Sequence, residues 1–151
     1  LPQLLALTAI DIHPPLYYIL LQGWLNVFGF EAATARFFSV VVGTLLIPVT
    51  SNLGQCLFNQ RVGMLTGAVI TLMPMAIYYS QEVRMYGLVT LLGTLSTYFL
   101  VTQALDKRFS AKQRLAAYVF STTLALYTMY YAAFIVLFQL LSSLLGLIPK
   151  Q

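Results

Sequence analysis

YSQEVRMY, residues 79–86, is a short polar segment between two long apolar runs, which cover roughly residues 63–78 and 85–105. Apolar runs of about 18 residues or more are typical of transmembrane helices. The segment therefore places Glu82 and Arg84 at the mouth of two membrane spans. An acid and a base at that depth are costly unless they pair, face water or take part in chemistry. A local ion pair that closes a helix end and a functional role explain these two residues about equally well.

The composition of the chain indicates an integral membrane protein. Of its 151 residues, 60% are hydrophobic and only 8% are charged, whereas a soluble domain carries about 25% charged residues. The net charge is +4, but the basic residues are few and lie between apolar runs, which favours topology signals over a nucleic-acid-binding surface. Cys56 is the only cysteine, so the chain can form neither an internal disulfide nor a cysteine metal site. Because the sequence begins at Leu1 and stops just after an apolar run, we expect an internal piece of a longer protein.

A second polar segment, DIHPPLYY at residues 11–18, precedes the first long apolar run. The residue before a proline is pushed out of the helical region, so His13 should be extended, and a helix can begin at Pro14 or Pro15. That helix would end near Gly29 and, at roughly 13 residues, is too short to span a membrane. We therefore expect a helix at the membrane interface, with unpaired N–H groups in its first turn that can hold a phosphate.

The rest of the chain predicts an all-α, polytopic transmembrane helix bundle of about five spans, in addition to the interfacial helix. The first span is expected at about residues 37–58, the second ends at about Tyr78, and the third covers about 85–105. In the second span, Gly63-x-x-x-Gly67 permits close contact with another helix, although this motif is common by chance.

The last apolar run, residues 115–148, contains no formal charge and is too long for one spanning helix of about 20 residues. Two short spans that turn near residues 127–131 fit better. The chain would then be one partial transmembrane domain, with an outer-face loop and interfacial helix in residues 1–35 and transmembrane helices in 36–148.

The distribution of charge predicts the orientation of these spans. Short loops rich in lysine and arginine remain cytoplasmic, so the basic loop after the third span should lie inside. Counting spans from this loop places Asp11, His13, Glu31 and Glu82 outside. Of the eight basic residues, those that then lie inside are Arg61, Lys107, Arg108, Lys112, Arg114 and Lys150. All the candidate chemistry therefore falls on one extracytoplasmic face.

The polar residues of that face suit catalytic or binding roles, but each also has a simpler explanation. Asp11 and His13 are two residues apart, so an extended backbone points both to one side, where they can share a ligand or a proton. From the residues alone, a helix-capping Asp11 and a solvent-facing His13 are favoured by about two to one. Arg36 suits bidentate binding of phosphate, but such an arginine is more often an interface anchor. The tyrosines near residue 130 are more often an aromatic belt than a site.

Both polar segments match the motifs of a known family. Residues 11–18 resemble the D-x-H-P-P-L-Y-Y signature of bacterial glycosyltransferase family 39 proteins, and residues 79–86 resemble their Y-S-Q-E-x-R-M-Y segment. The similar spacing continues through Ala35-Arg36 and Arg61-Val62-Gly63. These proteins are relatives of dolichyl-phosphate-mannose–protein mannosyltransferases and of the aminoarabinose transferase of lipid A. The chain is thus similar to this family over nearly its whole length.

The resemblance implies a GT-C membrane fold that transfers a sugar from a polyprenyl-phosphate donor to a protein, lipid or glycan acceptor. The enzyme would act at the extracytoplasmic face of the bacterial plasma membrane, with or without a divalent metal. Catalytic roles are implied for Asp11, His13, Glu82 and Arg84, and substrate binding for Pro14, Tyr17, Arg36 and Tyr86. The family's usual catalytic base, an aspartate upstream of the D-x-H-P-P motif, would lie outside this sequence, so we expect the chain alone to be inactive. Met129 stands where members often carry a histidine.

Two other classes of protein fit the composition. A transporter or channel predicts charged residues near the middle of the membrane, whereas Glu82 and Arg84 lie at the ends of spans. A structural membrane protein without catalysis would need no clustering of polar residues on one face. The positions of these charges therefore favour an enzyme that acts at the membrane surface.

Overall fold

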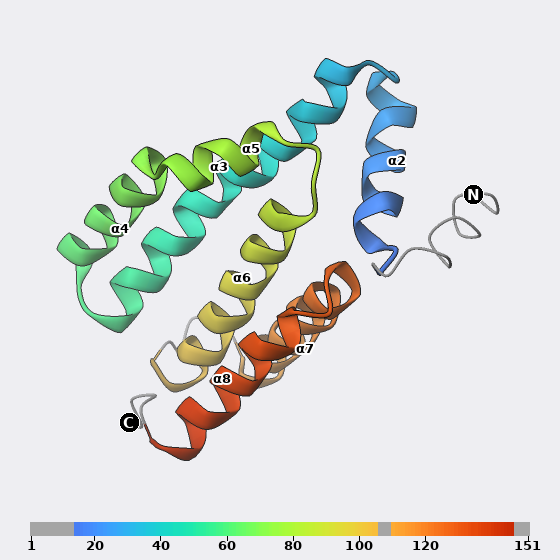
Figure 1. Cartoon of the computed structure of the whole chain (residues 1–151). Helices are drawn as coiled ribbons and strands as arrows, with labels where there is room; N and C mark the ends of the chain where they lie inside the picture. The colour runs from blue at the N-terminus through green and yellow to red at the C-terminus, as the bar shows by residue number, and fades with distance from the viewer. Residues whose placement is uncertain (1–13, 106–109, 147–151) are drawn as a thin grey trace.

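A computed structural model describes residues 14–105 and 110–146, which are helical and contain no strand (Figure 1). The all-α architecture predicted from the sequence is confirmed. Asp11, His13 and the basic residues Lys107 and Arg108 lie outside the described residues. The helices are α2 (Leu16–Phe28), α3 (Ala32–Leu57), α4 (Gln60–Leu72), α5 (Pro74–Gln81), α6 (Tyr86–Leu105), α7 (Ala111–Thr128) and α8 (Ala132–Leu144).

Helix α2 is the short helix predicted after the two prolines. Pro15 is its N-cap, and Gly29 ends it with a φ of 102°, a left-handed conformation that favours glycine. The side chain of Trp24 fixes α2 on the next helix, because its indole N–H donates to the carbonyl of Thr34 at 3.0 Å and its ring packs against Phe38. Helix α2 is therefore held against α3.

Helices α3, α4 and α5 correspond to the first two predicted spans. Helix α3 has 26 residues and is long and apolar enough to cross a membrane. Helices α4 and α5 meet that condition together, but they are bent by 56° at their junction. The bend follows from Pro74, because the residue before a proline is driven out of the helical region, and Met73 has an extended ψ of 117°. The second predicted span is thus a broken helix.

Close packing between α3 and α4 depends on small residues. A Cβ atom added to Gly63 would lie 2.7 Å from the backbone oxygen of Ser51, so only glycine fits there. The Ser51 hydroxyl also donates to the carbonyl of Gly63 at 2.9 Å, and Gly67 packs against the same serine. The close helix contact predicted for the two glycines is confirmed.

Helices α6, α7 and α8 form the other half of the bundle, and within the described residues none of them alone is long and apolar enough to cross a membrane. Ser110 starts α7 with a capping box, in which its side chain and that of Gln113 satisfy each other's backbone N–H groups. Helix α7 ends at Thr128 and α8 begins at Ala132, so the chain turns where the sequence predicted. Helices α6 and α8 are shorter apolar helices. The described helices together are compatible with a helical membrane bundle.

A buried glutamine joins these three helices. The side-chain amide of Gln139, only 2% exposed on α8, donates to the hydroxyls of Ser96 and Thr97 on α6, each at 3.0 Å. Its carbonyl oxygen accepts from the Tyr118 hydroxyl of α7 at 3.2 Å. Hydrogen bonds of this kind hold transmembrane helices together, because lipid chains offer no competing partner.

Replacing this glutamine with leucine should loosen α8. We expect Gln139→Leu to lower the free energy of unfolding in detergent by about 1–2 kcal/mol, because it removes the shared hydrogen-bond partner of three neighbours. Gln60→Leu, at an exposed position at the start of α4, is the matched control and should have little effect. Equal stability of the two variants would contradict the role of Gln139.

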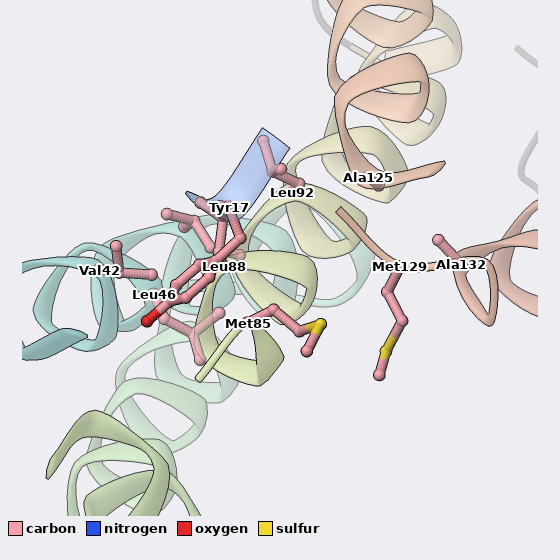
Figure 2. Close-up of a cluster of buried hydrophobic side chains, with 10 residues drawn as sticks. Tyr17, Val42, Leu46, Met85, Leu88, Leu92, Ala125, Met129 and Ala132 are labelled. Carbon is pink, nitrogen blue, oxygen red and sulfur yellow. The ribbon is translucent and has the colours of Figure 1, made fainter. Parts of the chain in front are cut away.

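The apolar core gathers segments that are distant in the sequence. Figure 2 shows Tyr17 from α2, Met85 directly before α6, Leu88 in the first turn of α6, and Met129 in the turn between α7 and α8. Val42 and Leu46 of α3 join the same cluster. The start of α2, the start of α6 and the α7–α8 turn therefore meet at one end of the bundle, beside the polar segment that precedes α6.

Candidate functional site

The polar segment between α5 and α6 contains a hydrogen-bonded charge pair. The hydroxyl of Tyr78, in the last turn of α5, donates to Oε1 of Glu82 at 2.6 Å. The Nε atom of Arg84 lies 3.6 Å from Oε2 of the same carboxylate, and the Arg84 side chain is 61% exposed. Hydrogen bonding to Tyr86, followed by the charge of Glu82, raises the pKa of Arg84, so its guanidinium stays protonated. Glu82 thus orients a permanently charged arginine that faces outward.

Neighbouring residues hold this segment in place. Met85 is buried in the core directly after Arg84, and Tyr86 then begins α6. The rings of Tyr79 and Tyr86 pack with their centroids 5.0 Å apart, which ties the end of α5 to the start of α6. Because both ends of the segment are anchored, the backbone that carries Glu82 and Arg84 has a defined position between α5 and α6.

Arg36 joins the same site from a different helix. It lies in the second turn of α3 and lines a shallow pocket of about 400 Å³ together with Tyr78, Gln81 and Glu82. Arg36 is exposed and makes no ion pair or hydrogen bond with any residue that the structure describes. The fold therefore brings next to the Glu82–Arg84 pair a second arginine that no described residue neutralises.

Pro14 and Tyr17 lie at the start of α2, where both side chains are buried. Tyr17 is 2% exposed, and its ring packs against Tyr18 and Phe38. Burial raises the pKa of the Tyr17 hydroxyl, and the nearby Ser39 hydroxyl offsets this in part, although the two groups do not reach hydrogen-bond geometry. As placed, Tyr17 holds α2 against α3, and its contact with substrate remains a prediction.

Two of the predicted site residues, Asp11 and His13, precede the described residues, so their placement stays a prediction. Among residues 14–105 and 110–146, no group of three or more His, Cys, Asp or Glu side chains could hold a metal ion. Sequence reasoning missed Tyr78, although its position four residues before Glu82 is the spacing that brings side chains together on one face of a helix.

Comparison with known proteins identifies the family of this chain. The family model described as dolichyl-phosphate-mannose-protein mannosyltransferase matches residues 12–148, a range that includes α2 to α8 and the whole polar segment before α6. No curated protein and no solved structure gave a match. Because the family model matches nearly the whole chain, this chain belongs to the dolichyl-phosphate-mannose-protein mannosyltransferase family.

Proposed function

We propose that the chain forms part of a membrane glycosyltransferase that moves a sugar from a polyprenyl-phosphate donor to an acceptor hydroxyl. The reaction would take place at the extracytoplasmic face of the bacterial plasma membrane, on a protein, lipid or glycan acceptor. Family membership supports sugar transfer in general. The observation that carries the finer proposal is the pair of arginines beside Glu82, because a phosphate leaving group needs fixed positive charge.

The leaving phosphate would be bound by Arg84 and Arg36. In the reaction the acceptor oxygen attacks the anomeric carbon of the sugar, the bond from that carbon to the phosphate oxygen breaks, and the phosphate departs with the electron pair. Arginine suits this task because its planar fork binds two phosphate oxygens at once. Glu82 would hold Arg84 in position, as its distance of 3.6 Å from the guanidinium supports. Tyr86 would assist, as its contribution to the raised pKa of Arg84 supports.

The acceptor would be ordered on the other side of the reacting carbon. We assign this task to Asp11 and His13, either directly or through a divalent metal. Pro14 and the first turn of α2 come next in the chain, so the unpaired N–H groups of that turn would face the same region. The proton of the acceptor hydroxyl would pass to a carboxylate acting as general base.

A transfer assay with a radiolabelled polyprenyl-phosphate sugar tests this proposal. The full-length protein that contains this chain, purified in lipid nanodiscs, should transfer label to an acceptor, and Asp11→Ala should lower the rate by about a hundredfold or more. Glu31→Ala, which removes an exposed acid that precedes α3, is the control and should retain the rate. Undiminished transfer by Asp11→Ala would remove Asp11 from the mechanism, and the absence of any transfer by the unaltered protein would overturn the proposed function.

A further inference from the structure

Two buried hydroxyl groups lie close together at the contact between α2 and α3. Tyr17 of α2 is 2% exposed and Ser39 of α3 is 5% exposed, and neither hydroxyl has a hydrogen-bond partner in the described part of the chain. Burial raises the pKa of Tyr17, and Ser39 lies close enough to offset part of that rise. The same side of α3 continues with the buried apolar residues Val42 and Leu46. Hydroxyls in such surroundings cost free energy, because they have lost their hydrogen bonds to water.

Comparable hydroxyls elsewhere in the bundle are satisfied. On α7, the buried hydroxyl of Thr128 donates to the Leu124 carbonyl at 2.8 Å, and that of Ser121 donates to the Ala117 carbonyl at 2.8 Å. Serine and threonine side chains in helices commonly bond in this way to the carbonyl one turn earlier. Ser39 departs from this pattern, because its hydroxyl donates to no carbonyl of α3. The unmet cost therefore lies at the contact between α2 and α3.

The two halves of α2 are attached to α3 with different strength. In the C-terminal half, the indole of Trp24 donates to the Thr34 carbonyl at 3.0 Å, and Gly29 then turns the chain with a φ of 102°. In the N-terminal half, Tyr17 is the one residue of α2 that is buried, and its hydroxyl is unpaired. Segments with few buried contacts open at low free energy. The N-terminal end of α2 is therefore the end that separates more easily from α3, with Trp24 and Gly29 as the pivot.

We propose that Ser39 is a positioning residue, which together with Tyr17 keeps the N-terminal end of α2 weakly attached, so that this end separates from α3 during turnover. The inference rests on the proposed function, and it adds which residues control the placement of Asp11 and His13. Residues 11–15 run directly into the first turn of α2, so a shift of that end moves both residues relative to the charged pair before α6. Such a movement lets substrate enter and then completes the site. Removing either hydroxyl should strengthen the contact and slow the movement, so stability and activity should change in opposite directions.

Amide hydrogen exchange of the full-length protein in lipid nanodiscs, read by mass spectrometry, measures how often α2 separates. An isolated helix of 13 residues is marginal in water, so the amides of α2 exchange once it leaves α3. Ser39→Ala should slow this exchange by about fivefold, the equivalent of about 1 kcal/mol for removing an unsatisfied buried hydroxyl. The rate of sugar transfer at saturating donor should fall by about the same factor, because the separated state is then less populated.

Ser121→Ala is the matched control, because it makes the same substitution at a buried serine whose hydroxyl is already bonded within α7. It should leave both the exchange of α2 and the rate of transfer unchanged. Tyr17→Phe removes the other unpaired hydroxyl and should slow the exchange of α2 as Ser39→Ala does. This second variant gives a decision even if Ser39→Ala does not fold.

The other outcomes separate this inference from the proposed function. Faster exchange of α2 in Ser39→Ala would mean that the two hydroxyls bond to each other or to a shared water molecule, and it would overturn the inference. Slower exchange with an unchanged rate of transfer would also overturn it, because separation of α2 would then have no part in turnover. The transferase proposal stands in both cases. If the unaltered protein transfers no sugar, the proposed function fails and the positioning role fails with it.

Discussion

Arg84→Ala is expected to lower the rate of sugar transfer by about 10²–10³-fold, the usual effect of removing one group that stabilises charge in a transition state. The reason is that Arg84 is the cation paired with Glu82 at the start of α6, where it would offset the charge of the leaving phosphate. The melting temperature should change little, because the side chain is 61% exposed and contributes little to the core. A transfer assay with labelled donor and a thermal unfolding scan in the same detergent measure the two effects.

Two companion variants sharpen this test. Arg84→Lys retains the charge but not the planar fork, so it should recover only part of the lost rate. Arg61→Ala removes an exposed arginine in the first turn of α4, away from the site, and should keep full activity. A rate for Arg84→Ala that matches the Arg61→Ala rate would contradict the role of Arg84 in binding the phosphate.

Much of the helical framework could be predicted from the sequence, because its signals are local. The prolines at 14 and 15 and the glycine at 29 mark the ends of α2, and both ends agree with the structure. The uncharged run after residue 114 is too long for one span, which predicted the turn after Thr128. Pro74 marks the break in the second span, but its 56° bend depends on how α5 packs and could not be read from composition.

The arrangement of the site was harder to predict, because it depends on contacts between distant segments. Arg36 and Glu82 are brought together only because α5 packs closely on α3 at Gly43 and Ser80. The burial of Tyr17 likewise depends on α3 and α6, and an aromatic residue at that position suits a membrane interface equally well when only the sequence is known. The periodicity of apolar residues predicts the helices and their ends. Which helices pack against each other depends on contacts between side chains that are far apart in the sequence.

Gly63→Leu is expected to lower the free energy of unfolding by about 3 kcal/mol, at the upper end of what overpacking usually costs. A first side-chain carbon at residue 63 would already lie 2.7 Å from the Ser51 backbone oxygen and 2.9 Å from Cβ of Gln55. Backbone atoms cannot rotate away, so α3 and α4 would have to separate, and the hydrogen bond from Ser51 to the Gly63 carbonyl would be lost. Chemical unfolding in mixed detergent micelles measures the change.

Gly23→Leu is the matched control, because nothing lies within 4 Å of a Cβ atom at that helical position. Similar stability of the Gly23 and Gly63 variants would contradict close packing of α3 on α4.

Gly63→Leu and Arg84→Ala should also differ in which properties they lose, because α4 continues through the bend into α5, which carries Tyr78 next to Glu82. Separating α3 from α4 should therefore disturb the site as well, so Gly63→Leu should lose both stability and transfer, whereas Arg84→Ala should lose transfer alone. Loss of transfer alone in Arg84→Ala, together with loss of both properties in Gly63→Leu, is the result expected if the site lies at the end of α5 and α3 positions it.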